Sequence, residues 1–405
     1  MKRKMELPKE VLYCIKQIEQ NGQEAYVVGG AIRSFLLGLE IHDYDLTTSA
    51  LPEELHKIFM NDKIIDTGLQ HGTITILKNH LPIEITTFRK DMTYEDHRHP
   101  DQVIFTSSLK DDLERRDFTM NAIGFHPKEG FIDYFEGTKD IKGKIIRTVG
   151  NPFLRFEEDA LRILRALRFS SELGFTIEEE TSKAIHSKKD DLNYIATERI
   201  LVEWIRLLEG DYASEVLREY RDVIEVFIKE LQEYQEEDWD NLLHLLSTSP
   251  KDFMIRFSLL LTPIKEKLPE NFYRRLTFSN EMKHKIKALI SHEKSDVDST
   301  ISLRLLCRDM EDDVISLIEY RCQLDSSLHK KALREEADRI LRDDCYSLKQ
   351  LKINGNDLIK LGLRGKEIQN ALNQLLDAVI YNRCPNEQEA LVNYYKTSLI
   401  SDNKL

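Results

Sequence analysis

The sequence VGGAIR at residues 28–33 and the sequence HDYDLTTS at residues 42–49 decide the fold of the front of this chain. The first places two glycines between a β-branched run and a helix-like run, and the second begins another β-branched run. Glycine lets the backbone approach a ligand closely, and the free amides at a helix start attract phosphate. We therefore expect a strand–turn–helix unit in which Gly30 and the forked guanidinium of Arg33 bind phosphate oxygens.

Asp43 and Asp45 lie two residues apart at the start of this second strand, so their side chains leave the same face. Two carboxylates so close repel each other unless a cation or a basic group joins them, and their oxygens suit a divalent cation. The alternative to a cation site is that the two aspartates simply begin an ordinary strand. The glycine pair and Arg33 upstream make this alternative the minority interpretation. Glu84, outward by alternation on a later strand, is either a third carboxylate of this site or a solvent-facing residue.

The rest of the chain divides into two regions of different composition. Glycine and short β-type runs are concentrated before about residue 150, whereas apolar residues recur at helical spacing from Phe156 to about Tyr395. The predicted fold class is therefore α+β, with an α/β front and an all-helical rear. Short, turn-bounded runs predict strands, and the run before a glycine predicts a helix: strands at residues 25–28, 44–48, 73–77 and 83–87, and a helix at residues 31–37.

A second motif is LERRDFTMNA at residues 113–122. Its paired arginines stand next to Asp117, and Asn121 follows four residues later. Arginine binds phosphate or ribose oxygens with a fork of donors, so Arg116 is a candidate ligand of a nucleotide, and Asn121 is within reach of a sugar hydroxyl. The alternative, a helix start with a surface ion pair, would be the default for an isolated motif.

A third motif, EEDALRILRALRF at residues 157–169, is the most specific. On one helix, its charged residues at every third position form a polar ridge beside a buried stripe of leucines. An aspartate accepts from an exocyclic amino group and an arginine donates to ring nitrogens or carbonyls, so the ridge complements the Watson–Crick edges of cytosine and adenine. The alternative is an amphipathic helix with weak ion pairs. The ridge residues are Asp159, Arg162, Arg165 and Arg168.

Composition and charge limit the possible classes of protein. The 405 residues suggest more than one domain at roughly 100–200 residues each. No apolar run approaches the roughly 18–20 residues of a membrane span, and no apolar stretch follows the basic start, so we expect a cytoplasmic location without membrane contact. Five scattered cysteines without a C-x-x-C pair are expected to be reduced thiols. The net charge of -13 means that any nucleic-acid contact must be local.

Together with TERILVE at residues 197–203, these motifs resemble, in order and spacing, the class II tRNA nucleotidyltransferases, the family of bacterial CCA-adding enzymes and poly(A) polymerases. The resemblance implies a polymerase-β-like head at residues 1–150, a helical neck at 151–210 that reads the base, and a helical body and tail at 211–405 that bind tRNA. It implies that Asp43 and Asp45 are catalytic and bind Mg²⁺ in a two-metal arrangement. It implies nucleotide contacts from Gly30, Arg33, Arg116, Asp159, Arg162, Arg165 and Arg168, with Glu84, Asn121 and Glu158 as possible additions.

The resemblance also assigns a supporting role and leaves one question open. Glu198 and Arg199 would brace the neck without touching the substrate. The family usually has an aspartate after the arginine of the first motif, whereas this chain has Ser34, so the group that orients Arg33 is undetermined at this point. Oligomeric state is likewise not set by the sequence.

The implied reaction is template-free addition of C, C and A to the 3′ end of tRNA from CTP and ATP, with release of pyrophosphate. A poly(A) polymerase or a partial CC- or A-adding enzyme would share these motifs, although residues 91–100 resemble the flexible loop of complete CCA-adding enzymes. A metal-dependent phosphohydrolase is a further alternative, but only one His-Asp pair, His42-Asp43, is present. A non-catalytic RNA-binding protein is disfavoured by the two intact aspartates.

Overall fold

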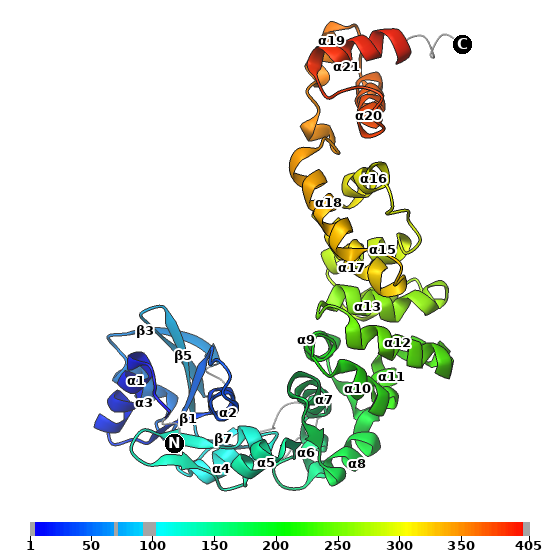
Figure 1. Cartoon of the computed structure of the whole chain (residues 1–405). Coiled ribbons are helices and arrows are strands. Elements are labelled where there is room, and N and C mark those ends of the chain that lie inside the picture. Colours follow the sequence, from blue (N-terminus) through cyan, green and yellow to red (C-terminus); the bar gives the residue numbers. More distant parts are fainter. Residues whose placement is uncertain (1–4, 69–71, 92–102, 400–405) are drawn as a thin grey trace. The chain divides into compact units, whose positions relative to one another are not determined.

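The computed structural model describes residues 5–68, 72–91 and 103–399. The chain forms two compact units. Figure 1 shows the strands in the N-terminal part of the chain and the helices that follow them along the sequence. The first runs to Glu233 and includes Arg275–Thr277, and the second comprises Tyr234–Arg274 and the chain from Phe278 onward. The expected domain boundaries at residues 150 and 210 both fall inside the first unit, and they stay predictions.

The first unit begins with a seven-stranded sheet in the order β3-β4-β5-β2-β1-β8-β9. Its neighbouring strands are antiparallel except for the parallel pair of β2 and β5. The four predicted strands are confirmed, and β3, β8 and β9 were not predicted. The strands are β1 (Ala25–Val28), β2 (Tyr44–Thr48), β3 (Lys63–Gly68), β4 (Thr73–Lys78), β5 (Leu81–Thr87), β8 (Gly124–His126) and β9 (Gly130–Ile132).

Helices cover the sheet and carry the second motif. The predicted helix after β1 is confirmed as α2 (Gly30–Leu37), which packs on β1 and β2 and ends at Gly38 in the left-handed conformation. Helix α1 packs on β1, and α3 packs on β4. The remaining elements of this part are α1 (Lys9–Gln20), α3 (Pro52–Ile58), the hairpin β6 (Arg89–Asp91) and β7 (Val103–Phe105), α4 (Leu109–Glu114), η2 (Thr119–Asn121) and α5 (Gly137–Gly143).

The first unit continues into helices that hold the third motif. The predicted continuous helix is wrong at Asp159, which has extended backbone angles (φ -148°, ψ 102°) between α6 (Pro152–Glu158) and α7 (Leu161–Leu173). The leucine stripe of α7 is buried as predicted, and α7 packs along α9. The other elements are a parallel pair, β10 (Ile145–Ile146) and β11 (Thr176–Ile177), then α8 (Glu179–Lys188), α9 (Thr197–Leu208), α10 (Ala213–Glu219) and α11 (Arg221–Phe227).

The second unit is helical throughout its described part, as predicted. One of its cores contains Leu358, Leu375, Ile380 and Leu391, all fully buried. No helix in the described ranges is long and apolar enough to cross a membrane. The helices of the second unit are α12 (Glu236–Thr248), α13 (Phe253–Leu261), α14 (Phe272–Arg275), α15 (Asn280–Ser291), α16 (Thr300–Met310), α17 (Val314–Leu324), α18 (Lys330–Asp343), α19 (Gly355–Lys360), α20 (Lys366–Ile380) and α21 (Gln388–Tyr394).

Candidate active site

The glycine turn between β1 and α2 brings the first two motifs together. Gly29 has a φ of 73°, which residues with a side chain rarely adopt. A Cβ atom on Gly29 would lie 3.5 Å from Nη1 of Arg116 and 3.6 Å from Oδ2 of Asp45. A Cβ atom on Gly30 would lie 3.8 Å from Nη2 of Arg33. The turn is therefore bordered by a carboxylate on one strand and by two guanidinium groups.

The acidic residues gather beside this turn. Asp45 is paired with Val28 of β1 on one side and with Glu84 of β5 on the other, so Glu84 shares the position of Asp45 on the adjacent strand. Burial, and then the charges of Asp43 and Glu84, raise the pKa of Asp45 to about 6, while Arg116 acts in the opposite direction. Asp43 and Glu84 themselves are exposed. This arrangement concentrates negative charge at one end of the glycine turn.

These carboxylates fit a divalent cation that shares its ligands with a substrate. No group of three or more His, Cys, Asp or Glu side chains in the described residues is arranged to hold a metal by itself. Mg²⁺ usually takes one or two protein carboxylates and completes its shell with phosphate oxygens and water. Burial and then the neighbouring carboxylates raise the pKa of Asp45, and such an ion would offset the repulsion among these carboxylates. The donor set of Asp43 and Asp45 is therefore suitable for Mg²⁺ bound together with a nucleotide.

Arg33 is oriented by residues of the second and third motifs. Its Nη1 donates to Oδ1 of Asn121, and its guanidinium carbon lies 4.6 Å from the ring centroid of Phe169. Asn121, only 6% exposed, in turn donates from Nδ2 to Oδ1 of Asp117 at 3.0 Å. Burial lowers the pKa of Arg33 to about 10. Asn121 and Phe169 thus hold Arg33, and Ser34 is not needed for this purpose.

The arginines of α7 contact residues of the second motif and of α9, and Arg162 and Arg168 are buried. The guanidinium of Arg165 binds Asp117, and that of Arg168 lies 2.6 Å from Oε2 of Glu203 on α9. Arg162 is 8% exposed and Arg168 is 2% exposed. Arg162 and Arg168 are therefore not exposed side chains, whereas the choice between a base-reading ridge and an amphipathic helix with ion pairs stays open.

Asp159 and Arg162 lie where the motifs meet. Oδ2 of Asp159 accepts from Nη2 of Arg199 at 2.9 Å, and Oδ1 accepts from the backbone of Leu161 at 3.1 Å. Arg162 donates from Nη1 to Glu158 at 2.5 Å and from Nη2 to the carbonyl of Arg115 at 3.0 Å. Arg199 thus contacts Asp159 as a bracing residue would. The expected roles of these residues toward a nucleotide stay predictions.

One buried residue of the site was missed. Asp112 on α4 is fully buried and binds Arg115 and Arg116 at the distances of ion pairs. Burial alone would raise its pKa, but the two arginines lower it below the usual value. Its spacing of three and four residues before the arginines was the available signal. The segment at residues 91–100, expected to resemble the flexible loop of complete CCA-adding enzymes, lies almost entirely outside the described residues.

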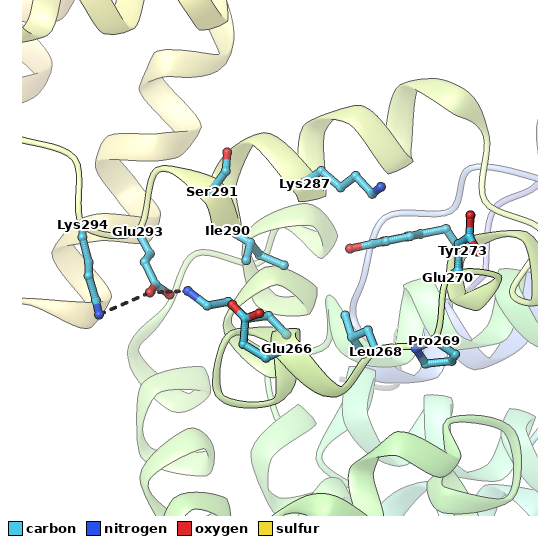
Figure 2. Close-up of a pocket in the computed structure, with 11 residues that line it drawn as sticks. Glu266, Leu268, Pro269, Glu270, Tyr273, Lys287, Ile290, Ser291, Glu293 and Lys294 are labelled. Carbon is cyan, nitrogen blue, oxygen red and sulfur yellow. Dashed lines mark hydrogen bonds and ion pairs between the residues drawn. The ribbon is translucent and has the colours of Figure 1, made fainter.

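A separate cavity of about 700 Å³ lies within the second unit. Figure 2 shows Lys287 beside the ring of Tyr273, with the ammonium 5.4 Å from the ring centroid. Lys265 forms an ion pair with Glu293 at the other end of the cavity, and Lys294 is 91% exposed beside it. No residue of the three sequence motifs lines this cavity. Its lysines and tyrosine are a candidate surface for nucleic acid.

Known families match along most of the chain. The poly A polymerase head domain matches residues 25–147. The family described as the RNA- and SrmB-binding site of polymerase A matches residues 174–233. Domain 2 of tRNA nucleotidyltransferase matches residues 248–395.

Individual proteins match over the full length. The CCA-adding enzyme of Ligilactobacillus salivarius is 37% identical over 402 residues, 96% of each chain, and that of Staphylococcus saprophyticus is 33% identical over 412 residues, 95% of this chain and 96% of the relative. The crystal structure of the Bacillus stearothermophilus CCA-adding enzyme in complex with CTP matches with a TM-score of 0.82 and 30% identity, over 99% of this chain and 100% of that one. The Thermotoga maritima enzyme complexed with tRNA shares the fold, with a TM-score of 0.65 and 22% identity over 96% of each chain.

These full-length matches agree with the α+β architecture of the chain. The chain belongs to the CCA-adding enzyme family of nucleotidyltransferases.

Proposed function

We propose that this protein adds C, C and A to the 3′ end of tRNA from CTP and ATP without a nucleic-acid template, releasing pyrophosphate. The observation that supports the proposal is the Gly29 turn, where the carboxylate of Asp45 and the guanidinium of Arg116 both lie beside the start of helix α2. Such a start attracts the phosphates of a nucleotide, and the carboxylate supplies a metal ligand beside them. A cytoplasmic location is part of the proposal.

In the proposed mechanism, Asp43 and Asp45 would hold Mg²⁺ together with the incoming nucleotide. When bound, Mg²⁺ would supply activation of the 3′-hydroxyl of the RNA and neutralisation of the charge on the departing pyrophosphate. Gly30, Arg33 and Arg116 bind the phosphates from the helix side. Glu84, opposite Asp45 in the parallel register, adds a third negative charge and is the candidate for a further ligand.

Base selection is assigned to Asp159 and Arg162. Asp159 keeps acceptor capacity for an amino group of cytosine or adenine, because each carboxylate oxygen has two lone pairs and accepts one contact here. Arg162 is engaged by Glu158 and by the Arg115 carbonyl, so donation to a base requires it to give up one of these partners. Arg165 and Arg168 support this pair from the same helix.

A single incubation tests the proposal. Purified protein, Mg²⁺, labelled CTP and ATP, and a tRNA transcript that lacks its terminal CCA are combined, and the products are sequenced. We expect addition of C, C and A, and we expect Asp45→Asn to abolish it. A long A tail would instead identify a poly(A) polymerase, addition of C alone or of A alone would identify a partial enzyme, and no incorporation would contradict the proposal.

A further inference from the structure

Asp112 is a charged side chain in the interior of the first unit. Asp112 lies on α4 and is fully buried. Its two carboxylate oxygens accept hydrogen bonds from three separate segments of the chain: the arginine motif, strand β2 and strand β6. They accept from Nε and Nη2 of Arg115 at 3.0 and 2.8 Å, from Nη2 of Arg116 at 3.3 Å, and from Oγ1 of Thr47 at 3.0 Å. The backbone amide of Arg89 is a further donor at 3.4 Å. A buried carboxylate requires such partners, and here they connect the arginine motif to the sheet.

The two arginines bound by Asp112 are used differently. Arg115 offers two nitrogens to Asp112, and its backbone carbonyl accepts from Arg162, so it is held within the protein. Arg116 is held by Nη2 alone. Its Nη1 lies next to the Gly29 turn, and its buried Nε has no hydrogen-bond partner among the described residues. One edge of the Arg116 guanidinium is therefore anchored, while donors remain for a ligand at the turn.

The contact with Thr47 joins this anchor to the metal-binding strand. Thr47 follows Asp45 by two residues on β2, so both side chains leave the same face of the sheet. Thr47 is itself fully buried. A single carboxylate thus contacts the strand that carries Asp45 and the arginine that faces Asp45 across Gly29.

We propose that Asp112 is a positioning residue, which fixes Arg116 relative to Asp45 so that the arginine meets the triphosphate of the incoming nucleotide. The inference rests on the proposed function. It concerns phosphates, which CTP and ATP share, and therefore predicts an effect that does not depend on the base.

The primary test is Asp112→Asn, which preserves shape and removes the charge. Partners that orient the groups of a metal site typically contribute about 10- to 100-fold to affinity or activity. We expect KM to rise by about that factor for CTP and ATP alike, with the ratio of kcat/KM for CTP and UTP unchanged. Unchanged KM values in the folded variant, or a loss for one nucleotide only, would overturn the proposal.

A double-mutant cycle with Arg116→Ala separates positioning from general support of the fold. If Asp112 acts through Arg116, Asp112→Asn should change KM by less than about threefold in the Arg116→Ala background, because groups that act as a unit are not additive. A full additional effect there would show that Asp112 acts elsewhere and would overturn the proposal. Lys139→Gln serves as the control, because it alters an exposed ion pair of the same unit that does not touch Asp112 and should leave KM near that of the wild type.

Thr47→Val decides the question if Asp112→Asn does not fold. It removes one hydrogen bond to Asp112 and leaves both ion pairs, so we expect KM for both nucleotides to rise by about 2- to 10-fold. An unchanged KM would overturn the proposal. Two measurements separate the role of Asp112 from the proposed function. In the incorporation assay, absence of CCA addition by the wild type refutes the proposed function. In calorimetric titration of CTP with Mg²⁺, equal CTP affinity of wild type and variant refutes the role of Asp112.

Discussion

The guanidinium of Arg165 on α7 donates from Nε to Oδ2 of Asp117 at 2.8 Å, and its Nη2 lies 2.6 Å from the same oxygen. The other oxygen of Asp117 accepts from Asn121, which accepts from Arg33. Asp117 therefore links Arg33, through Asn121, to Arg165 on the helix that is proposed to select the base. A substitution of Asp117 should therefore disturb both Arg33 at the glycine turn and Arg165 on α7.

The first prediction concerns the stability of this link. Asp117→Asn removes the closer charged partner of Arg165, whose side chain is 34% exposed and which keeps Glu203 at 3.7 Å. We therefore expect a loss of roughly 1–3 kcal/mol, the cost of a weakened hydrogen bond to a charged group. Although burial opposes ionisation, Arg165 and Asn121 hold the pKa of Asp117 far below its usual range. The pair therefore stabilises the fold above the pKa of the unfolded carboxyl, about 3.9, and this contribution is lost as the pH falls toward the folded value.

Thermal unfolding of the wild type and of Asp117→Asn between pH 3 and pH 7 measures this effect. The difference in Tm should be constant from about pH 5 to pH 7 and should shrink below about pH 4. Lys331→Gln, which alters an exposed ion pair in the second unit, is the control and should leave Tm unchanged. Equal Tm values for wild type and Asp117→Asn at pH 7 would refute the importance of the link.

Local sequence was sufficient for some of these elements and insufficient for others. Strands β1 and β2 were predictable to the residue, because each is a short β-branched run bounded by turn residues. Strands β8 and β9 have three residues each, too few for an alternating pattern. The break at Asp159 was not predictable, because the residues around it favour a helix and its partner Arg199 is forty positions away.

The same limit applies to the site. The motif residues at the glycine turn could be identified because glycines and paired aspartates are unusual at a strand end. Asp112 could not, since an acid three and four residues before two arginines is also the pattern of an ordinary surface pair. Only the tertiary contact with Thr47 and the burial of both residues distinguish it. Asn121 supports Arg33 in the structure, a contact that the sequence did not indicate, and its reach toward a sugar hydroxyl stays a prediction.

A second prediction concerns the carboxylates. Asp43→Ala or Asp45→Ala should lower kcat at least about 100-fold, because a metal ion at the reacting phosphate loses a ligand where charge develops. Glu84→Gln should be much milder if Glu84 acts only through its charge, and equally severe if it is a third ligand. Single-turnover incorporation of CTP, with tRNA affinity and Tm measured alongside, distinguishes these outcomes. Near-normal turnover in either aspartate variant would refute the metal assignment.

A third prediction follows from the raised pKa of Asp45. With that pKa at about 6, a proton competes with a divalent cation for the carboxylate below pH 6. The Mg²⁺ concentration for half-maximal activity should therefore rise from pH 7.5 to pH 5.5. Glu84→Gln removes one of the charges that raise this pKa, so in this variant the Mg²⁺ concentration for half-maximal activity should begin to rise at a lower pH. Identical pH profiles for wild type and Glu84→Gln would show that Glu84 does not act on Asp45.

A fourth prediction concerns tRNA binding by the second unit. Despite the net charge of -13, tRNA affinity should fall with salt, because each phosphate neutralised by a basic group releases a counterion. Lys287→Gln and Lys294→Gln at the cavity should weaken tRNA binding and reduce the salt slope by about one each. Lys331→Gln is the matched control, because Lys331 is 91% exposed, as is Lys294, and lies outside the residues that line the cavity. A slope that is the same in all four proteins would exclude these lysines from the interface.

The last prediction concerns base selection by Asp159. Its carboxylate is 18% exposed, is fixed by Arg199, and retains acceptor capacity for the amino group that cytosine and adenine share. Asp159→Ala removes that acceptor, so the carbonyl of uracil no longer meets a repelling oxygen. One such contact is worth roughly 1–3 kcal/mol, and the preference for CTP over UTP should fall by about 10- to 100-fold.

The control for this experiment is Glu157→Gln, which removes the same charge two residues earlier, where the side chain pairs with Lys188 at the surface. The ratio of kcat/KM for CTP and UTP is measured in the wild type and both variants, together with Tm. If Asp159 only braces the junction of α6 and α7 through Arg199, Tm should fall while the ratio stays constant. A ratio that falls in Asp159→Ala but not in Glu157→Gln would place the selection of the base at the Asp159 carboxylate. The Glu157→Gln control excludes the loss of charge as the cause, and the Tm measurement excludes the loss of stability.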